Sequence, residues 1–310
     1  MSATGDDGGV VTAHVDSTPA PRSPLAAASA AVAKGVSAVP PTALLLLGVI
    51  SVQVGAAVAK HLFAQVGASG AVTLRLVLAA LVLVVVWRPS LRMPARTWVV
   101  VGGFGVVLGA MNLLIYQAIE RIPLGAAVTI EFLGPLSVAV LGSRRWVDGL
   151  WAVLAGVGVL LLARADGGLS FAGVAFALGA AACWAAYILL SAAVGGRTSG
   201  GGGLALAMVV GSLVVLPFGI GEAGAELVDP TVLLIGLGVA LLSSVVPYSL
   251  ELEALRRIPS RTFGVLMSLG PAAAALAGLV LLGERLNWVQ WGAVACVVAA
   301  SIGATRSARR

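Results

Sequence analysis

Charged residues are scarce in this chain. Only 10% of its 310 residues are Asp, Glu, Lys or Arg, against about 25% in an ordinary soluble domain. Apolar residues make up 59%, and apolar runs of membrane-spanning length recur along the whole sequence. The composition excludes a typical soluble domain and predicts an all-α polytopic membrane protein. The formal net charge of +6 does not indicate a nucleic-acid partner, because the basic residues lie in short segments between apolar spans.

Cysteine and histidine are almost absent. Cys183 and Cys296 each lie inside an apolar run, and His14 and His61 have no neighbouring partner for catalysis. A zinc or iron–sulfur site needs a cluster of such ligands, and an intramembrane hydrolase needs a base or a metal. We therefore predict that the protein is not an enzyme and that it has no catalytic residues, no metal and no cofactor.

The chain divides into a polar tail and a series of apolar segments. Residues 1–41 lack apolar periodicity and are predicted to be a disordered cytoplasmic tail, and residues 306–310 a basic cytoplasmic C-terminus. We do not expect this segment to be a signal peptide, because it carries Asp6, Asp7 and Asp16 where a signal peptide would be basic. Between the two ends we predict ten transmembrane helices, at about 42–60, 71–87, 97–117, 124–142, 147–163, 170–190, 204–220, 231–250, 262–282 and 287–305.

The distribution of Lys and Arg predicts the orientation. With a cytoplasmic N-terminus, fourteen of these residues fall in inner segments and four in outer segments, while Arg75 lies within a span. Positive residues favour the cytoplasmic side. Both termini are therefore expected to be cytoplasmic.

A short pattern occurs twice. Ile122-Pro123 and Gly134-Pro135 recur as Ile258-Pro259 and Gly270-Pro271, offset by 136 residues in both cases. Because five spans precede the middle of the chain and five follow, the second copy enters the membrane from the opposite side. We predict two inverted five-helix repeats, 42–165 and 166–305, an architecture typical of alternating-access carriers.

Each repeat carries a Gly-Pro pair inside a span. Proline cannot donate its backbone hydrogen bond and glycine adds flexibility, so Gly134, Pro135, Gly270 and Pro271 predict breaks in their helices. Two readings stay open, a gating hinge and a static bend whose freed carbonyls are satisfied by neighbouring helices.

Strongly polar side chains within the spans are few. Glu131, Arg75, Gln53 and Asn112 come from four different helices, and helix rise places each within about 10 Å of the same membrane surface. Similar depth on different helices predicts one polar pocket. Tyr116 joins this group, and Tyr187 and Tyr248 are the candidates of the second half.

The chemistry of these groups suits a small zwitterion such as an amino acid. Arg75 offers a fork of donors to a carboxylate. Glu131 can hold an ammonium group or a proton, and Gln53 and Asn112 both donate and accept hydrogen bonds. An alternative is that Arg75 and Glu131 form a structural ion pair with each other. The position equivalent to Glu131 in the second repeat is Met267, so only the first repeat carries this carboxylate.

A further group of charges follows the eighth span. We interpret it as a solvated salt-bridge network in one inner loop that could latch an inward-closed state, formed by Glu251, Glu253, Arg256, Arg257 and Arg261.

Residues 42–305 resemble the drug/metabolite transporter superfamily with two EamA-type repeats, and within it the bacterial inner-membrane threonine/homoserine exporters. The stretch from Ile122 through Glu131 is one match. The others are Gln53-Val54-Gly55-Ala56 through Lys60, Thr73-Leu74-Arg75-Leu76, Gly109-Ala110-Met111-Asn112-Leu113, Ser143-Arg144-Arg145, Cys183-Trp184-Ala185, Pro247-Tyr248-Ser249-Leu250-Glu251, Arg261-Thr262-Phe263-Gly264 and Leu282-Gly283-Glu284.

The resemblance implies a secondary active transporter that exports threonine, homoserine or similar small neutral amino acids across the lipid bilayer in exchange for protons. Many family members carry Glu before the proline of the ninth helix, where this chain has Gly270. Glu131 is then the only coupling carboxylate expected deep in a span. The alternatives are an exporter of another metabolite or drug, with Arg75 arguing against cations, and a non-transporting membrane scaffold or sensor.

Overall fold

The computed structural model describes residues 39–141, 146–164, 169–198, 201–255, 257–258 and 260–307. The described residues from Pro41 onward belong to one compact unit. The predicted tail lies almost wholly outside the described residues, as do Ser143-Arg144-Arg145 and the last three residues of the basic C-terminus.

All regular elements within these ranges are helices. In chain order they are α2 (Pro41–Trp87), α3 (Ala95–Arg121), α4 (Leu124–Glu131), α5 (Leu133–Leu141), α6 (Trp146–Arg164), α7 (Phe171–Gly195), α8 (Gly202–Ala223), the 3₁₀ turn η1 (Gly224–Val228), α9 (Pro230–Ala240), the π-helical turn η2 (Leu241–Val245), α10 (Val246–Leu255), α11 (Ser260–Met267), α12 (Gly270–Leu282) and α13 (Trp288–Ser307).

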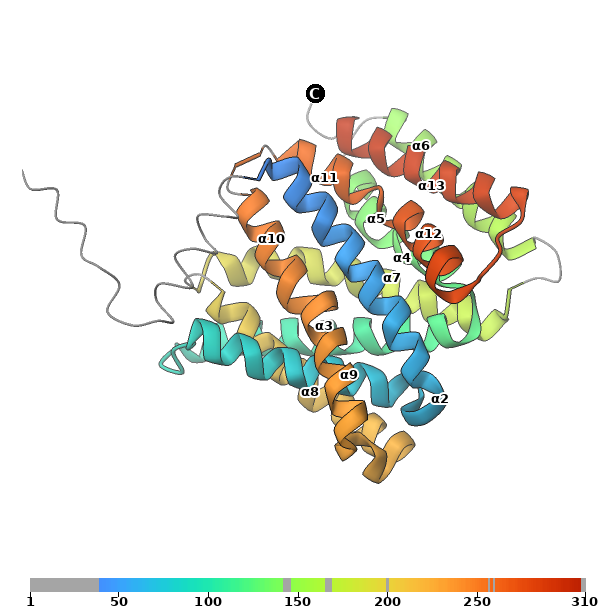
Figure 1. Cartoon of the computed structure of the whole chain (residues 1–310). Coiled ribbons are helices and arrows are strands. Elements are labelled where there is room, and N and C mark those ends of the chain that lie inside the picture. The colour runs from blue at the N-terminus through green and yellow to red at the C-terminus, as the bar shows by residue number, and fades with distance from the viewer. Residues whose placement is uncertain are drawn as a thin grey trace, which may run out of the picture. The chain divides into compact units, whose positions relative to one another are not determined.

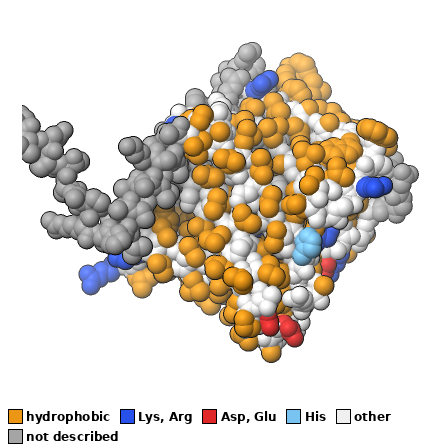
Figure 2. Space-filling model, in the orientation of Figure 1, with side chains coloured by type: hydrophobic (Ala, Val, Ile, Leu, Met, Phe, Trp, Pro, Cys, Tyr) orange, Lys and Arg blue, Asp and Glu red, His pale blue; other side chains and the backbone are white. Residues whose placement is uncertain are grey.

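Eight helical segments among the described residues are long and apolar enough to cross a membrane, and a shorter apolar helix covers Trp146–Leu162. Large apolar side chains stay exposed on their outer faces, for example Val85, Val99 and Val280, each at least 70% exposed. Figure 2 shows hydrophobic side chains across one face and charged ones mainly at its margins. Such a surface suits lipid rather than water. The prediction of an all-helical, multi-pass membrane protein is confirmed.

The first long helix, α2, is divided by one residue. Gly67 has φ 66° and ψ 177°, a conformation that is essentially restricted to glycine. The helix resumes directly after it, and Glu222 of α8 accepts a hydrogen bond from the Ser69 backbone N–H at 2.7 Å. A carboxylate at a helix N-terminus satisfies free N–H groups and complements the helix dipole. Helix therefore runs up to both sides of Gly67, beyond the predicted span ends at about residues 60 and 71.

The two Gly-Pro pairs coincide with helix breaks. Pro135 has no N–H for the carbonyl four residues earlier, that of Glu131, and α4 ends at Glu131 while α5 begins at Leu133. Pro271 stands in the same relation to Met267, where α11 ends before α12 begins at Gly270. The predicted breaks are present at both positions.

A third break lies between α9 and α10, where the chain forms the π turn η2. Pro247 has no N–H to give to Ser243, four residues earlier. The neighbouring carbonyl of Leu242 accepts from Ser51 Oγ of α2 at 2.6 Å. A β-carbon on Gly55 would lie 2.2 Å from Ser243 Oγ, so only glycine allows α2 to approach the turn this closely.

Helix α2 runs through the centre of the bundle in contact with α8, α9 and α10 (Figure 1). Helix α3 packs on α7 and α8, and α6 packs on α13. Helix α4 packs on α12, where a β-carbon on Gly125 would lie 2.7 Å from the Ala275 backbone. The kinked and broken helices α2, α4–α5, α9–α10 and α11–α12 meet around the cavity described next.

Candidate functional site

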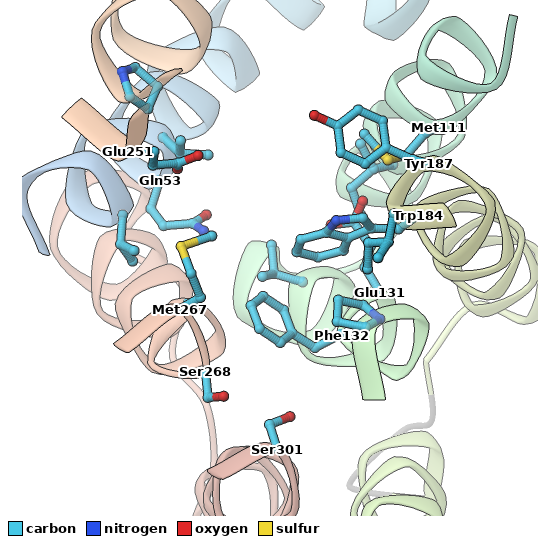
Figure 3. Close-up of a pocket in the computed structure, with 18 of the residues that line it drawn as sticks. Gln53, Met111, Glu131, Phe132, Trp184, Tyr187, Glu251, Met267, Ser268 and Ser301 are labelled. Carbon is cyan, nitrogen blue, oxygen red and sulfur yellow. The ribbon is translucent and has the colours of Figure 1, made fainter. Parts of the chain in front are cut away.

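A cavity of about 590 Å³ lies between these helices. Side chains from α2, α3, α4, α5, α7, η2, α10, α11, α12 and α13 reach it. All seven side chains predicted to bind substrate or protons line it, namely Gln53, Arg75, Asn112, Tyr116, Glu131, Tyr187 and Tyr248. Figure 3 shows Gln53 and Glu251 on one side of the space and Met111, Tyr187 and Trp184 on the other.

Arg75 is held in place by the π turn. Its Nη2 donates to the Ser243 carbonyl at 3.0 Å and its Nε to Ser244 Oγ at 3.2 Å. The Ser243 carbonyl is the one that receives no backbone hydrogen bond from Pro247, because proline has no N–H. The guanidinium also lies 5.6 Å from the centroid of the Tyr116 ring, within the range of a cation–π contact. An arginine has five N–H donors, so donors remain for a ligand after these contacts.

Glu131 lies at the end of α4 and is only 8% exposed. Within the described ranges its carboxylate has no hydrogen bond or ion pair, and Arg75 is not its partner within 4 Å. A buried carboxylate without a partner is unfavourable in a membrane protein. It is thus available to a proton or a cationic ligand in the cavity.

Four other buried polar atoms at the cavity have no hydrogen-bond partner among the described residues: Gln53 Oε1, Tyr116 OH, Ser243 Oγ and Ser301 Oγ. Buried polar groups in proteins are nearly always satisfied. These unpaired atoms come from α2, α3, η2 and α13 and surround one cavity. A polar ligand bound there could supply their missing hydrogen bonds.

Two of the remaining predicted side chains, Asn112 and Tyr187, contact neighbouring groups. Asn112 Nδ2 donates to the Leu108 carbonyl of its own helix at 2.9 Å. The ring of Tyr187 packs on Phe104 with centroids 4.9 Å apart, and Phe132 meets Trp184 edge to face at 4.9 Å. These aromatic contacts form an apolar wall beside the polar groups, a common composition for small-molecule sites.

The hinge candidates lie at the cavity wall or directly behind it. Pro135 and Gly270 line the cavity, and Pro271 is buried. A β-carbon on Gly134 would lie 2.4 Å from the Ala181 carbonyl of α7. The breaks in α4–α5 and α11–α12 are thus next to the site, and Met267 also faces it.

Glu251 is the residue that sequence reasoning misplaced. It lies within α10, lines the cavity and is half-buried. The interpretation of one solvated network is wrong for this residue, because Glu253 rather than Glu251 pairs with Arg257, at 2.8 Å from its Nε. The spacing from Tyr248 to Glu251, three residues on one helix face, was the signal that could have found it. Glu131 is therefore not the only carboxylate at the site.

A second polar arrangement joins three segments of the chain. Lys60 Nζ of α2 lies 2.6 Å from Glu284 Oε1, and Glu284 Oε2 accepts from the Leu124 N–H at the start of α4 at 2.8 Å. One carboxylate thus joins α2, the N-terminus of α4 and the segment after α12. Both ionic partners are mostly buried, so this contact is stronger than a freely solvated ion pair.

Known proteins are similar to this chain in sequence or in fold. The EamA-like transporter family matches residues 171–306. The "Threonine/homoserine exporter RhtA" of Escherichia coli (strain K12) is 44% identical over 274 residues, which cover 87% of this chain and 92% of that protein. Its namesake in Salmonella typhimurium (strain LT2) is 43% identical with the same coverage. A solved crystal structure aligns with a TM-score of 0.61 at 18% identity, over 86% of this chain and 98% of its own, and supports the fold alone.

Proposed function

The chain belongs to the EamA-like transporter family, and we propose that it exports small neutral amino acids of the threonine/homoserine type by proton antiport and alternating access. As a member of a transporter family it is not an enzyme. The observation that carries the proposal is a cavity with one anchored guanidinium and a buried, unpaired carboxylate.

The proposed binding mode assigns one group to each end of the substrate. Arg75 binds the carboxylate, because its remaining donors form a fork of suitable geometry. Glu131 binds the ammonium group. Gln53, Asn112 and Tyr116 shape the pocket for a side-chain hydroxyl, and Tyr187 and Tyr248 are further candidates for contact with the substrate. The unpaired Gln53 Oε1 and Tyr116 OH support this assignment.

Glu131 is also the proposed proton carrier. Because its carboxylate has one position in the cavity, it holds either a proton or the substrate ammonium, and each displaces the other. A carrier that must have one of them bound before it changes state exchanges substrate for protons. The lack of a hydrogen bond or ion pair between Glu131 and any described side chain supports this role.

We further propose ten transmembrane helices in two inverted repeats, 42–165 and 166–305. The break of α2 at Gly67, the matching breaks at the two Gly-Pro pairs and the family match to residues 171–306 support this arrangement. Opposed repeats with broken helices at the site are the usual basis of alternating access. The two Gly-Pro breaks would then serve as hinges.

The excess of positive charge in alternate segments supports cytoplasmic termini in a bacterial inner membrane. In that orientation Ser191, Glu251 and Thr305, which line the cavity near the ends of their helices, lie toward the cytoplasm. The Lys60–Glu284 contact lies at the opposite, outer ends. The structure then corresponds to an inward-facing state in which an exporter loads its substrate.

The Lys60–Glu284 contact is the proposed outer gate. We expect Glu284→Gln to favour outward opening, because the neutral amide loses the ion pair with Lys60. A Val128→Cys side chain in the cavity wall, in a background with Cys183→Ser and Cys296→Ser, should react about three- to ten-fold faster with a membrane-impermeant thiol reagent added outside, as expected for a shift of about 1 kcal/mol.

Glu120→Gln is the matched control for this variant. Glu120 forms an ion pair with Arg121 on the same side of the protein, but it does not line the cavity and should leave labelling unchanged. If the Val128→Cys side chain reacted at the same rate with and without the Glu284→Gln substitution, the Lys60–Glu284 contact would not be the outer gate.

Counterflow in proteoliposomes tests the proposed substrate class. The purified full-length chain, preloaded with unlabelled threonine, should accumulate labelled threonine and homoserine transiently. Exchange of other metabolites or drugs without either amino acid would favour the alternative exporter. A complete lack of flux, from protein that remains folded, would favour a membrane scaffold or sensor.

A further inference from the structure

Glu251 gives the cavity a second carboxylate. It lies one helical turn after Tyr248 on α10, and both line the cavity. Its Cγ lies 3.7 Å from where a β-carbon on Gly48 would be, so α2 closes off one side of the carboxylate. Figure 3 shows its side chain on the opposite side of the space from Tyr187.

No described side chain neutralises the carboxylate of Glu251. No hydrogen bond or ion pair reaches it in the part of the chain that the structure describes. The polar side chains that interact with it electrostatically include the phenols of Tyr187 and Tyr248, which bring no positive charge. Among the residues whose side chains the structure describes, Arg257 is a nearby cation in the sequence, and it is paired with Glu253.

The charges around the cavity do not balance. Among the described residues that line it, Arg75 is the one cation, and Glu131 and Glu251 are two acids. When both acids are ionised, a zwitterionic amino acid adds no net charge and leaves one carboxylate uncompensated, which is costly away from bulk water. An amino acid with a cationic side chain brings the one positive charge that balances the site.

The dimensions also suit a longer, cationic substrate. A cavity of about 590 Å³ falls within the roughly 300–1,000 Å³ of sites for drug-sized ligands. Glu131 lies ten residues before the end of α5, which corresponds to about 15 Å along the helix axis at ~1.5 Å per residue. Glu251 lies four residues before the end of α10, which corresponds to about 6 Å. The two carboxylates are then about 9 Å apart in depth if those helix ends are level. The two ammonium groups of lysine, with a hydrogen bond at each, bridge up to about 12 Å.

We propose that the cavity also accepts amino acids with a positively charged side chain, such as lysine, and that Glu251 holds the side-chain ammonium. The α-carboxylate binds Arg75 and the α-ammonium group binds Glu131, so this inference rests on the binding mode of the proposed function. Arg75 alone argued against cations, whereas Glu251 reverses that conclusion for a substrate that also carries a carboxylate.

Counterflow of labelled lysine and labelled threonine, measured side by side in proteoliposomes, tests this inference. Wild-type protein should exchange lysine, and lysine should compete with threonine. Nε-acetyl-lysine, which keeps the stem and loses the charge, should compete at least ten-fold more weakly than lysine. Glu251→Gln should lower the ratio of lysine to threonine exchange at least ten-fold. Glu253→Gln, on the same helix but paired with Arg257, should leave that ratio unchanged.

A selectivity ratio separates this role from a structural one, because loss of folded protein lowers both fluxes together. Threonine exchange with neither exchange of nor competition by lysine would overturn the cation site. An unchanged ratio in Glu251→Gln would overturn the role of this residue. Lysine exchange without threonine exchange would refute the neutral-amino-acid proposal and support the cation site.

Discussion

Replacement of Glu131 by Gln is expected to eliminate pH-driven threonine efflux, with a loss of at least about 30-fold. Glutamine has nearly the same shape but neither takes up nor releases a proton. It also lacks the charge that pairs with an ammonium group, and loss of one partner of a buried charge pair costs about 2–5 kcal/mol. The residual exchange should no longer depend on pH.

The cavity itself should persist in the Glu131→Gln variant. No described side chain makes a hydrogen bond or ion pair with the Glu131 carboxylate, so its neutralisation breaks no contact of the fold. Initial rates of labelled threonine efflux from proteoliposomes with and without a pH gradient provide the measurement. Glu120→Gln, at an exposed ion pair with Arg121, is the control. A Glu131→Gln protein with wild-type, pH-dependent efflux would show that coupling lies elsewhere.

The second large effect is expected at Arg75. Arg75→Lys keeps the charge but replaces a planar fork by a single point charge. Lysine cannot contact the Ser243 carbonyl and Ser244 Oγ and still present parallel donors to a carboxylate. We expect the half-saturation concentration for threonine to rise about 10- to 100-fold, the equivalent of about 1.4–2.8 kcal/mol.

The measurement is concentration-dependent counterflow, with Arg197→Lys as the control. Arg197 is exposed and donates to the Ala193 carbonyl of its own helix, so its conservative replacement should not alter affinity. Unchanged threonine affinity in Arg75→Lys would exclude the proposed carboxylate contact.

The sequence was informative where the physics is local or compositional. Apolar runs predicted a helical membrane protein, and Pro135 and Pro271 predicted helix breaks because a missing N–H acts within one turn. The convergence of Arg75, Glu131 and Gln53 followed from helix rise alone. Each of these inferences needs only the neighbouring residues and the thickness of a bilayer.

The features that sequence reasoning missed depend on contacts between distant segments. Lys60 and Glu284 are 224 residues apart, and Glu222 meets Ser69 from 153 residues away. Glu251 was assigned to a loop because charges follow the eighth apolar run. The helix α10 nevertheless continues to Leu255, which turns this carboxylate into the cavity.

The π turn before Pro247 had no clear sequence signal either. Its effect is that Ser243 presents a carbonyl to Arg75, from the other half of the chain. The orientation of Arg75, the proposed donor to the substrate carboxylate, is thus fixed by a backbone irregularity that only the tertiary structure shows. π turns of this kind are frequent at functional sites.

Net transport of threonine against its gradient is the most direct test of proton antiport. Proteoliposomes of the purified chain, with equal labelled threonine on both sides and the membrane potential clamped, would be placed in an acidic external medium. Proton entry should drive threonine out, so the internal threonine concentration should fall below the external one, and the internal pH should fall faster with threonine present. Equal threonine concentrations with and without the pH gradient, in vesicles that carry out threonine counterflow, would contradict proton coupling.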